Sequence, residues 1–206
     1  MNIVLNNKLK TFGGDMAIGA AGLFTTYTQL IVMVVIGICQ GMQPIIGYNF
    51  GAGRISRLQR TFWLAVTAAS VVTAVGFAAA QLMPRAIARA FTTDAELIAN
   101  TASGLRTAMS MFFVVGFQII ATTLFQSIGA AAKSIFLSLT RQVLFVIPML
   151  LTLPPLLGLR GVWICFPMSD LAATLVTAFM VAWQLRCFSR MGDTAALAEE
   201  SDKALE

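Results

Sequence analysis

The residue with the clearest potential for chemistry is Asp170, because it lies inside a long apolar segment. An ionisable side chain is expensive to keep in a membrane, so it marks a functional site by default. Its carboxylate could bind a proton or a sodium ion, or pair with a cationic ligand. Two structural roles compete with this hypothesis. Asp170 could cap backbone amides freed in a helix broken beside Pro167 and Ser169, or it could pair with Arg141.

Arg141 and Gln142 stand at the predicted beginning of another apolar segment. An arginine at a helix end commonly extends its charged group to the membrane surface, which is the simplest interpretation. The alternative is a gate or an ion pair between helices.

Further polar residues interrupt the apolar segments. Gln40 and Gln43 are three positions apart and therefore lie near one face of a helix. Pro44 beside them removes a backbone hydrogen bond, so a role in lining a substrate cavity is plausible for this trio. Asn49 and Gln126 are candidates for the same cavity or for gating. The alternative for all of these polar side chains is ordinary hydrogen bonding between helices, worth roughly 0.6 kcal/mol each.

Several kinds of chemistry are excluded by the residues present. The chain has no histidine, which excludes imidazole-based catalysis or proton relay within it. Its three cysteines, Cys39, Cys165 and Cys187, show neither metal-ligand nor disulfide spacing, and we expect them to be apolar packing residues. The segment Gly51–Gly53 follows no strand and lacks the lysine of a phosphate loop. We therefore predict no catalytic residue, no metal site and no enzyme activity.

The composition is that of a membrane protein. Of 206 residues, 58% are hydrophobic and 11% are charged, and the mean hydropathy is +0.81. A soluble domain usually carries about 25% charged residues, so an ordinary globular enzyme is excluded. The net charge of +5 does not indicate nucleic-acid binding. The basic residues stand at the ends of apolar runs, where they fix topology and meet lipid headgroups.

We predict an all-α, polytopic membrane helix bundle with about five full transmembrane helices and the end of another. A helix needs about 20 apolar residues to cross a bilayer. The predicted spans are Ala17–Tyr48, Phe62–Met83, Thr107–Ile128, Val143–Leu157 and Gly161–Leu185.

The remaining segments are predicted to flank these spans. Residues Met1–Gly14 are expected to be the end of a further helix. Residues Pro84–Arg106 are expected to form an outside loop with a short amphipathic helix, which Thr93 or Asp94 would cap.

Basic residues predict the orientation. Eight lysines and arginines lie on the side that includes the C-terminus and six on the other. This bias places the C-terminus in the cytoplasm. Residues 1–190 are then one transmembrane domain, and residues 191–206 are a polar cytoplasmic tail, either a frayed helix or disordered.

One segment points to a family. The stretch from Gly41 to Gly53, GMQPIIGYNFGAG, followed by Arg57, closely resembles a signature of the C-terminal half of multidrug and toxic compound extrusion (MATE) transporters. Other segments resemble parts of the same family in the same order: Gly13–Ile18, Phe91–Asp94, Phe125–Gly129, Leu139–Gln142 with Ile147-Pro148, and Gly161–Trp163 with Pro167–Asp170.

The resemblance implies one of two six-helix lobes in a bacterial inner-membrane antiporter. Such a transporter exports organic cations or other drugs by alternating access, in exchange for protons or sodium, and needs no other cofactor. The chain would correspond to the end of the seventh helix and the eighth to twelfth, with the N-terminal lobe as its missing partner. Some members hold sodium with acids in the seventh and tenth helices, but Thr107–Ile128 contains no acid. That site is therefore not carried over, and Asp170 and Arg141 are the candidates for coupling.

Two other functions stay open at this point. The chain could belong to a flippase of lipid precursors or polysaccharides on a related fold, or it could be an inactive truncated remnant. An integral-membrane enzyme is disfavoured, because histidine and clustered acids are lacking.

Overall fold

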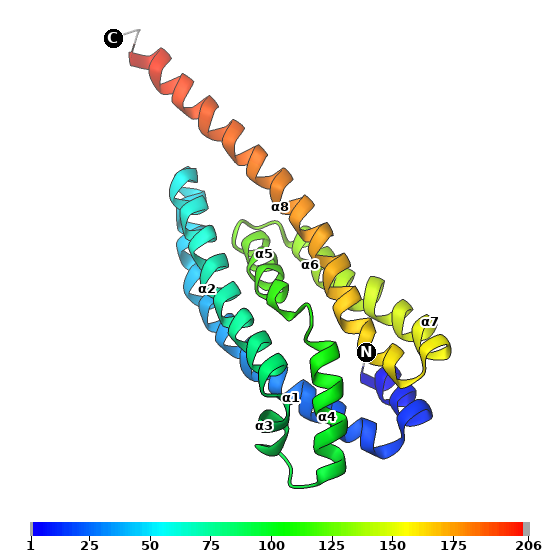
Figure 1. Cartoon of the computed structure of the whole chain (residues 1–206). Helices are drawn as coiled ribbons and strands as arrows, with labels where there is room; N and C mark the ends of the chain where they lie inside the picture. The colour runs from blue at the N-terminus through cyan, green and yellow to red at the C-terminus, as the bar shows by residue number, and fades with distance from the viewer. Residues whose placement is uncertain (1, 204–206) are drawn as a thin grey trace.

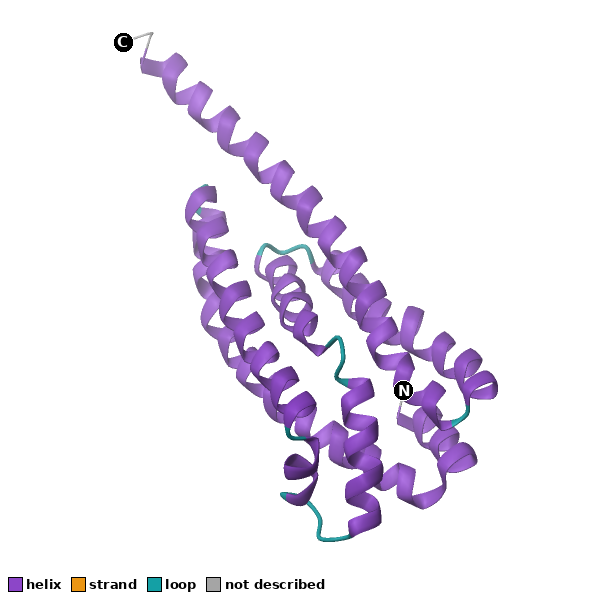
Figure 2. Cartoon of the chain, viewed as in Figure 1, coloured by secondary structure: helices purple, strands orange, loops and turns teal. Residues whose placement is uncertain are grey.

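The chain folds into a bundle of long helices, 91% helical and without strands in its described part. The structure is a computed structural model that describes the backbone of residues 2–203 and the side chains of residues 5–188. Figure 1 shows the bundle and Figure 2 its short loops. The elements are α1 Asn2–Gly51, α2 Ile55–Leu82, α3 Pro84–Arg89, α4 Ala95–Ala108, the 3₁₀ turn η1 Phe112–Val114, α5 Val115–Ser127, α6 Ala131–Leu139, the π-helical turn η2 Thr140–Val146, α7 Ile147–Leu157 and α8 Leu159–Lys203.

The predicted all-α membrane architecture is confirmed. Four helical stretches of the described chain are long and apolar enough to cross a bilayer, and a fifth span forms if α4 and α5 count as one helix bent by 55°. Within α1, Gly14 adopts φ 64° and ψ −164°, which breaks the helix. Glycine reaches this region at little steric cost. The first residues thus form a separate helical segment before the first span, as predicted.

The loop prediction for Pro84–Arg106 is wrong. This segment forms α3 and most of α4, and α4 packs against α1 and α8. Leu105 and Ala108 are buried in a core that they share with Phe24 and Trp163. Polar residues on the exposed face of α4 hid this apolar face from the hydropathy pattern. The predicted cap is confirmed at Asp94, whose Oδ1 accepts hydrogen bonds from the amides of Glu96 and Leu97 at 2.9 and 3.2 Å.

Two predicted features of the last spans are also corrected. The fourth span begins at Ala131 rather than Val143, because α6, η2 and α7 form one continuous helical stretch. The expected break in the fifth span is absent, since α8 continues through Pro167. It also continues to Lys203, so much of the predicted tail extends this helix, while residues 204–206 lie outside the described part.

Two apolar cores hold the bundle together. One joins the first half of α1 to α4, α7 and the beginning of α8, and the other joins the second half of α1 to α2, α5 and the end of α8. Side chains at Val35, Cys39, Met42 and Ile46 form the buried stripe of α1 in the second core. Their spacing of three and four residues is that of one helix face.

Candidate functional site

An ion pair joins η2 to α8. Arg141 Nε donates to Asp170 Oδ1 at 2.9 Å. The Asp170 side chain is only 6% exposed, whereas that of Arg141 is 33% exposed. The pairing weighed from the sequence is therefore observed. The alternative of a cap for a broken helix has no basis, because α8 is continuous at Asp170.

The pair lies deep within its two spans. Arg141 is about 15 Å from the Ala131 end of its span at a rise of 1.5 Å per residue. Asp170 is about 16 Å from the Leu159 end of its own span by the same measure. The hydrocarbon core of a bilayer is about 30 Å thick, so both side chains lie near its middle. The expectation that Arg141 reaches the membrane surface from a helix end is therefore wrong.

Gln118 on α5 locks this region of α8 in place. Its Nε2 donates to the backbone carbonyl of Asp170 at 2.7 Å and to Thr174 Oγ1 at 2.5 Å. The Thr174 hydroxyl donates in turn to the same carbonyl at 2.6 Å. Gln118 is 5% exposed, so these contacts satisfy a polar group that would otherwise be costly to bury. The backbone of the residue that carries the acid is thus held from a second helix.

A polar cavity of about 270 Å³ lies beside the ion pair, between α5, α6, η2 and α8. Its polar lining comprises Gln118, Thr122, Thr123, Gln126, Ser138, Arg141, Gln142 and Thr177. Arg141 therefore links the cavity to Asp170, which is buried behind it. The arrangement can hold a polar or charged guest, and it can change its own charge if the carboxylate is neutralised.

The sequence analysis missed Gln118 and most of the threonines and serines of this cavity. A signal was present, because Gln118, Thr122 and Gln126 follow each other at intervals of four and share one face of α5. Ser138 and Gln142 repeat this spacing on the facing helical stretch. Two polar stripes in apolar spans indicate a cavity better than any single residue does.

The other predicted site residues fall in two places. Gln126 lines the polar cavity with Arg141, as described. Gln40, Gln43 and Pro44 are exposed on α1, on the side opposite its buried stripe, and the structure does not bring them to the ion pair. Asn49 is buried, and its Nδ2 donates to the carbonyl of Ile45 on the same helix at 2.8 Å.

No cofactor site is visible in the described residues, among which no group of three or more Asp, Glu, His or Cys side chains could hold a metal ion. The cysteines at positions 39 and 165 are buried thiols without a disulfide.

Comparisons with known proteins agree with this architecture. A model of the MatE family matches residues 1–152. The multidrug export protein MepA of Staphylococcus haemolyticus is 26% identical over 179 residues, which are 86% of this chain and 38% of that protein. MepA of Staphylococcus aureus (strain MSSA476) is 25% identical over 185 residues, which are 89% and 40% of the two chains. The chain thus spans about two fifths of the length of these curated relatives.

Solved structures show the same fold. The MATE multidrug transporter DinF-BH, solved in complex with an organic cation, has a TM-score of 0.75 and 38% identity, over 84% of this chain and 39% of that one. A MATE in the bent conformation has a TM-score of 0.86 over 93% and 42% of the two chains, but its 21% identity makes it evidence for the fold alone.

Proposed function

This chain belongs to the MatE family, and from that premise we propose that it is a helical lobe of a multidrug efflux antiporter. The transporter would export organic cations or other drugs in exchange for protons or sodium ions, by alternating access and without covalent chemistry. The observation that carries this proposal is the Arg141–Asp170 ion pair, buried near the middle of two spans beside a polar cavity.

The ion pair supplies an element with two states. An unpaired charge at this depth is costly, so Arg141 and Asp170 stay together while both are charged. A proton or sodium ion that neutralises the carboxylate removes the attraction. The guanidinium is then free to turn into the polar cavity, where the side chains of Gln126 and Gln142 can solvate it. Binding of the coupling ion would in this way change both the charge and the shape of the cavity.

Substrate contact is proposed on two surfaces. The polar cavity is one, with Gln126 and Arg141 in its lining. The other is the exposed side of α1 at Gln40, Gln43 and Pro44, near Asn49. Polar side chains on an exposed side of a spanning helix are expensive to leave against lipid. We therefore propose that this side faces the transport path rather than the bilayer.

A second lobe would complete the path. The part that this chain matches is 38% to 40% of the length of the curated relatives, which supports a partner lobe, encoded with this chain or separately. The assembly would lie in the bacterial inner membrane with the C-terminus of this chain in the cytoplasm, as the distribution of basic residues predicts.

Efflux from proteoliposomes tests the proposal. The product of the whole reading frame around this sequence is reconstituted, loaded with ethidium and driven by an imposed proton or sodium gradient. Ethidium is a fluorescent organic cation, and the similar transporter DinF-BH was solved with a ligand of that class. Asp170→Asn is expected to lower gradient-driven efflux by about tenfold or more, because it removes the site of neutralisation. Asp94→Asn is the matched control, since it makes the same chemical change in an acid that caps α4.

Two results would overturn the proposal. Asp170→Asn could leave both the rate of efflux and its dependence on the gradient unchanged, which would remove the coupling role. The unmodified protein could fail to move ethidium and other organic cations yet translocate a fluorescent lipid precursor, which would establish a flippase instead.

A further inference from the structure

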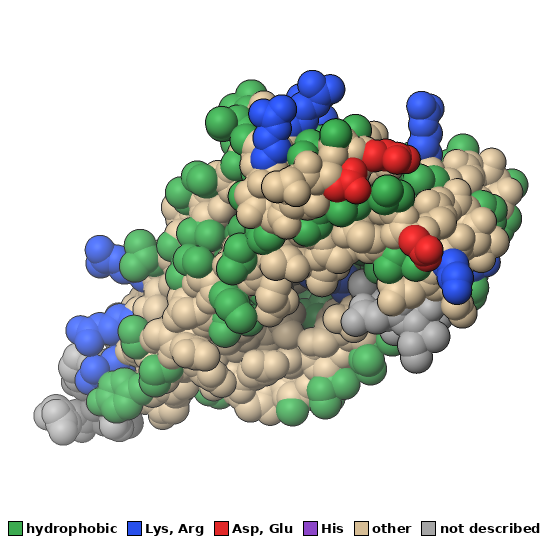
Figure 3. All heavy atoms as spheres, turned by 90° about the horizontal axis from the view of Figure 1, so that it is seen from below, with side chains coloured by type: hydrophobic (Ala, Val, Ile, Leu, Met, Phe, Trp, Pro, Cys, Tyr) green, Lys and Arg blue, Asp and Glu red, His purple; other side chains and the backbone are tan. Residues whose placement is uncertain are grey.

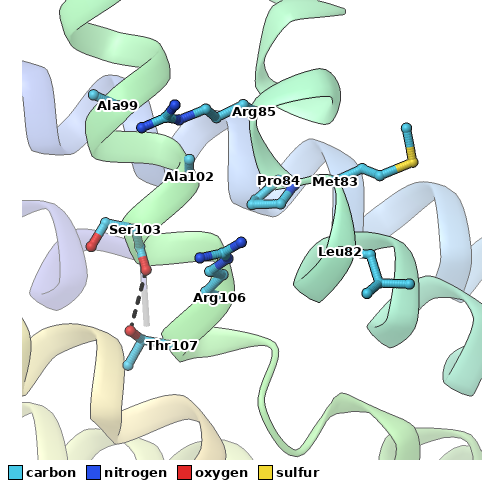
Figure 4. Close-up of a pocket in the computed structure, with 9 residues that line it drawn as sticks. All are labelled: Leu82, Met83, Pro84, Arg85, Ala99, Ala102, Ser103, Arg106 and Thr107. Atoms are coloured by element: carbon cyan, nitrogen blue, oxygen red, sulfur yellow. Dashed lines mark hydrogen bonds between the residues drawn. The ribbon is translucent and has the colours of Figure 1, made fainter.

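A second pocket lies far along the bundle from the ion pair, where α2, α3 and α4 meet. It has a volume of about 530 Å³ and is lined by Arg85 and Arg106, with Ser103 and Thr107 beside them. Figure 4 shows both guanidinium groups extending into the space between α4 and the turn at Pro84. We call this the arginine pocket. It is a different site from the polar cavity, because the two have no lining residue in common.

The charge of the arginine pocket is not compensated by protein groups. No acidic side chain lines it. Among the side chains that the structure describes, the sole ion pair is the one between Arg141 and Asp170, so neither Arg85 nor Arg106 has a carboxylate partner. Two like charges converging on one space repel each other unless an anion lies between them. Guanidinium groups favour phosphate oxygens, which they can bind with two hydrogen bonds each.

The frame of the arginine pocket is held in place. Gln81 Nε2 on α2 donates to the backbone carbonyl of Arg106 on α4 at 2.9 Å. Pro84 is buried at the beginning of α3, and its ring fixes the backbone next to Arg85. Asp94 caps α4 from the other side of the loop. The two arginines therefore project from backbones whose separation is fixed, as a preformed site requires.

The surroundings of the arginine pocket are those of a membrane surface. Leu82 and Met83, which line its edge, are 78% and 60% exposed. They end the span of α2, where lipid chains give way to headgroups. Figure 3 looks onto this end of the bundle, and Lys and Arg side chains project from its rim next to exposed apolar ones. A ligand that joins a phosphate to apolar chains fits both parts of this lining.

We propose that the arginine pocket binds the phosphate of an anionic phospholipid, with the acyl chains lying along Leu82 and Met83. Basic pockets between spanning helices bind such headgroups in the same way. The occupant anchors the α2–α3–α4 corner to the membrane, independently of drug export.

Native mass spectrometry of the full protein in detergent tests this assignment, with dioctanoyl phosphatidylglycerol as the probe and dioctanoyl phosphatidylcholine as the neutral comparison. We expect one phosphatidylglycerol to bind at least about tenfold more tightly than phosphatidylcholine, since charge-assisted hydrogen bonds to phosphate carry the difference. The double substitution Arg85→Gln with Arg106→Gln should remove this preference. Arg89→Gln is the matched control, because it removes the same charge from the same short helix at a residue that does not line the pocket.

The contrary results separate the alternatives. An unchanged preference in the double variant would overturn the assignment, and so would an equal loss in Arg89→Gln, which would indicate diffuse surface charge. Displacement of the lipid by inorganic phosphate at an equal concentration would show a site for free anions instead. Because both arginines are exposed, the variants should fold normally, and their unchanged unfolding midpoint in detergent checks this.

Discussion

Removing either partner of the Arg141–Asp170 pair should destabilise the bundle unequally. Arg141→Met leaves behind a carboxylate that is 6% exposed, whereas Asp170→Asn leaves a guanidinium that is 33% exposed and retains an oxygen acceptor. Breaking a buried pair from one side costs about 3–5 kcal/mol, which we expect for Arg141→Met. For Asp170→Asn we expect about 1–2 kcal/mol, because one charge-assisted hydrogen bond is weakened and water still reaches the arginine.

The double variant isolates the interaction between the two side chains. Once both charges are gone, no unpaired ion stays in the span. The loss should therefore be about 2 kcal/mol smaller than the sum of the single losses. Unfolding by dodecyl sulfate in mixed micelles measures all four proteins, with the fluorescence of Trp63, Trp163 and Trp183 as the signal. Strictly additive losses, or a larger loss for Asp170→Asn than for Arg141→Met, would refute the reasoning.

Three further predictions concern the frame around the site. Gly116→Ala would place its Cβ 2.8 Å from the carbonyl oxygen of Ala69, so we expect a loss of about 1–3 kcal/mol in the same unfolding assay. Gly41→Ala, which meets open space, should be neutral or slightly stabilising, and equal losses would contradict the packing argument. Gln118→Met removes both hydrogen bonds to α8 and should cost about 1–2 kcal/mol; a change below about 0.5 kcal/mol would show that they contribute little. Asp94→Ala should cost about 1 kcal/mol through the lost helix cap and speed amide exchange in the first turn of α4, whereas exchange as slow as in Asp94→Asn would argue against the cap.

The order of the spans could be predicted from the sequence because each is a long apolar run. The break after the first segment could also be placed, since Gly13 and Gly14 interrupt the run with a residue that tolerates positive φ. Hydropathy failed at α4, whose buried positions include Thr101 and Gly104. These residues are small rather than strongly apolar, so α4 is defined by close packing against Trp163 and not by its mean hydropathy.

The candidate site was predictable in its residue types but not in its depth. Asp170 and Arg141 were identified because charges in spans are rare. The position of Arg141 was misjudged, because Lys133 and two serines gave the stretch before it a polar appearance. In the structure this stretch is helical, and Lys133 donates from near its beginning to Gln184 Oε1 at 2.7 Å and lies 4.7 Å from the ring centre of Trp183. Such contacts between distant segments cannot be deduced from local pattern.

The difference in exposure between the two charges has a consequence for the proposed coupling. Asp170 is almost fully enclosed, and Arg141 lies between it and the polar cavity. A coupling ion that arrives through the cavity therefore meets the guanidinium before the carboxylate, so the arginine must turn aside as the ion binds. The π-helical turn that carries Arg141 suits this movement, because such turns interrupt the regular hydrogen-bond ladder of a helix and occur frequently at functional sites. Asp170, by contrast, is held through its own carbonyl by Gln118. The proposed switch thus combines a fixed acid with a movable base, and its direction follows from which of the two faces the cavity.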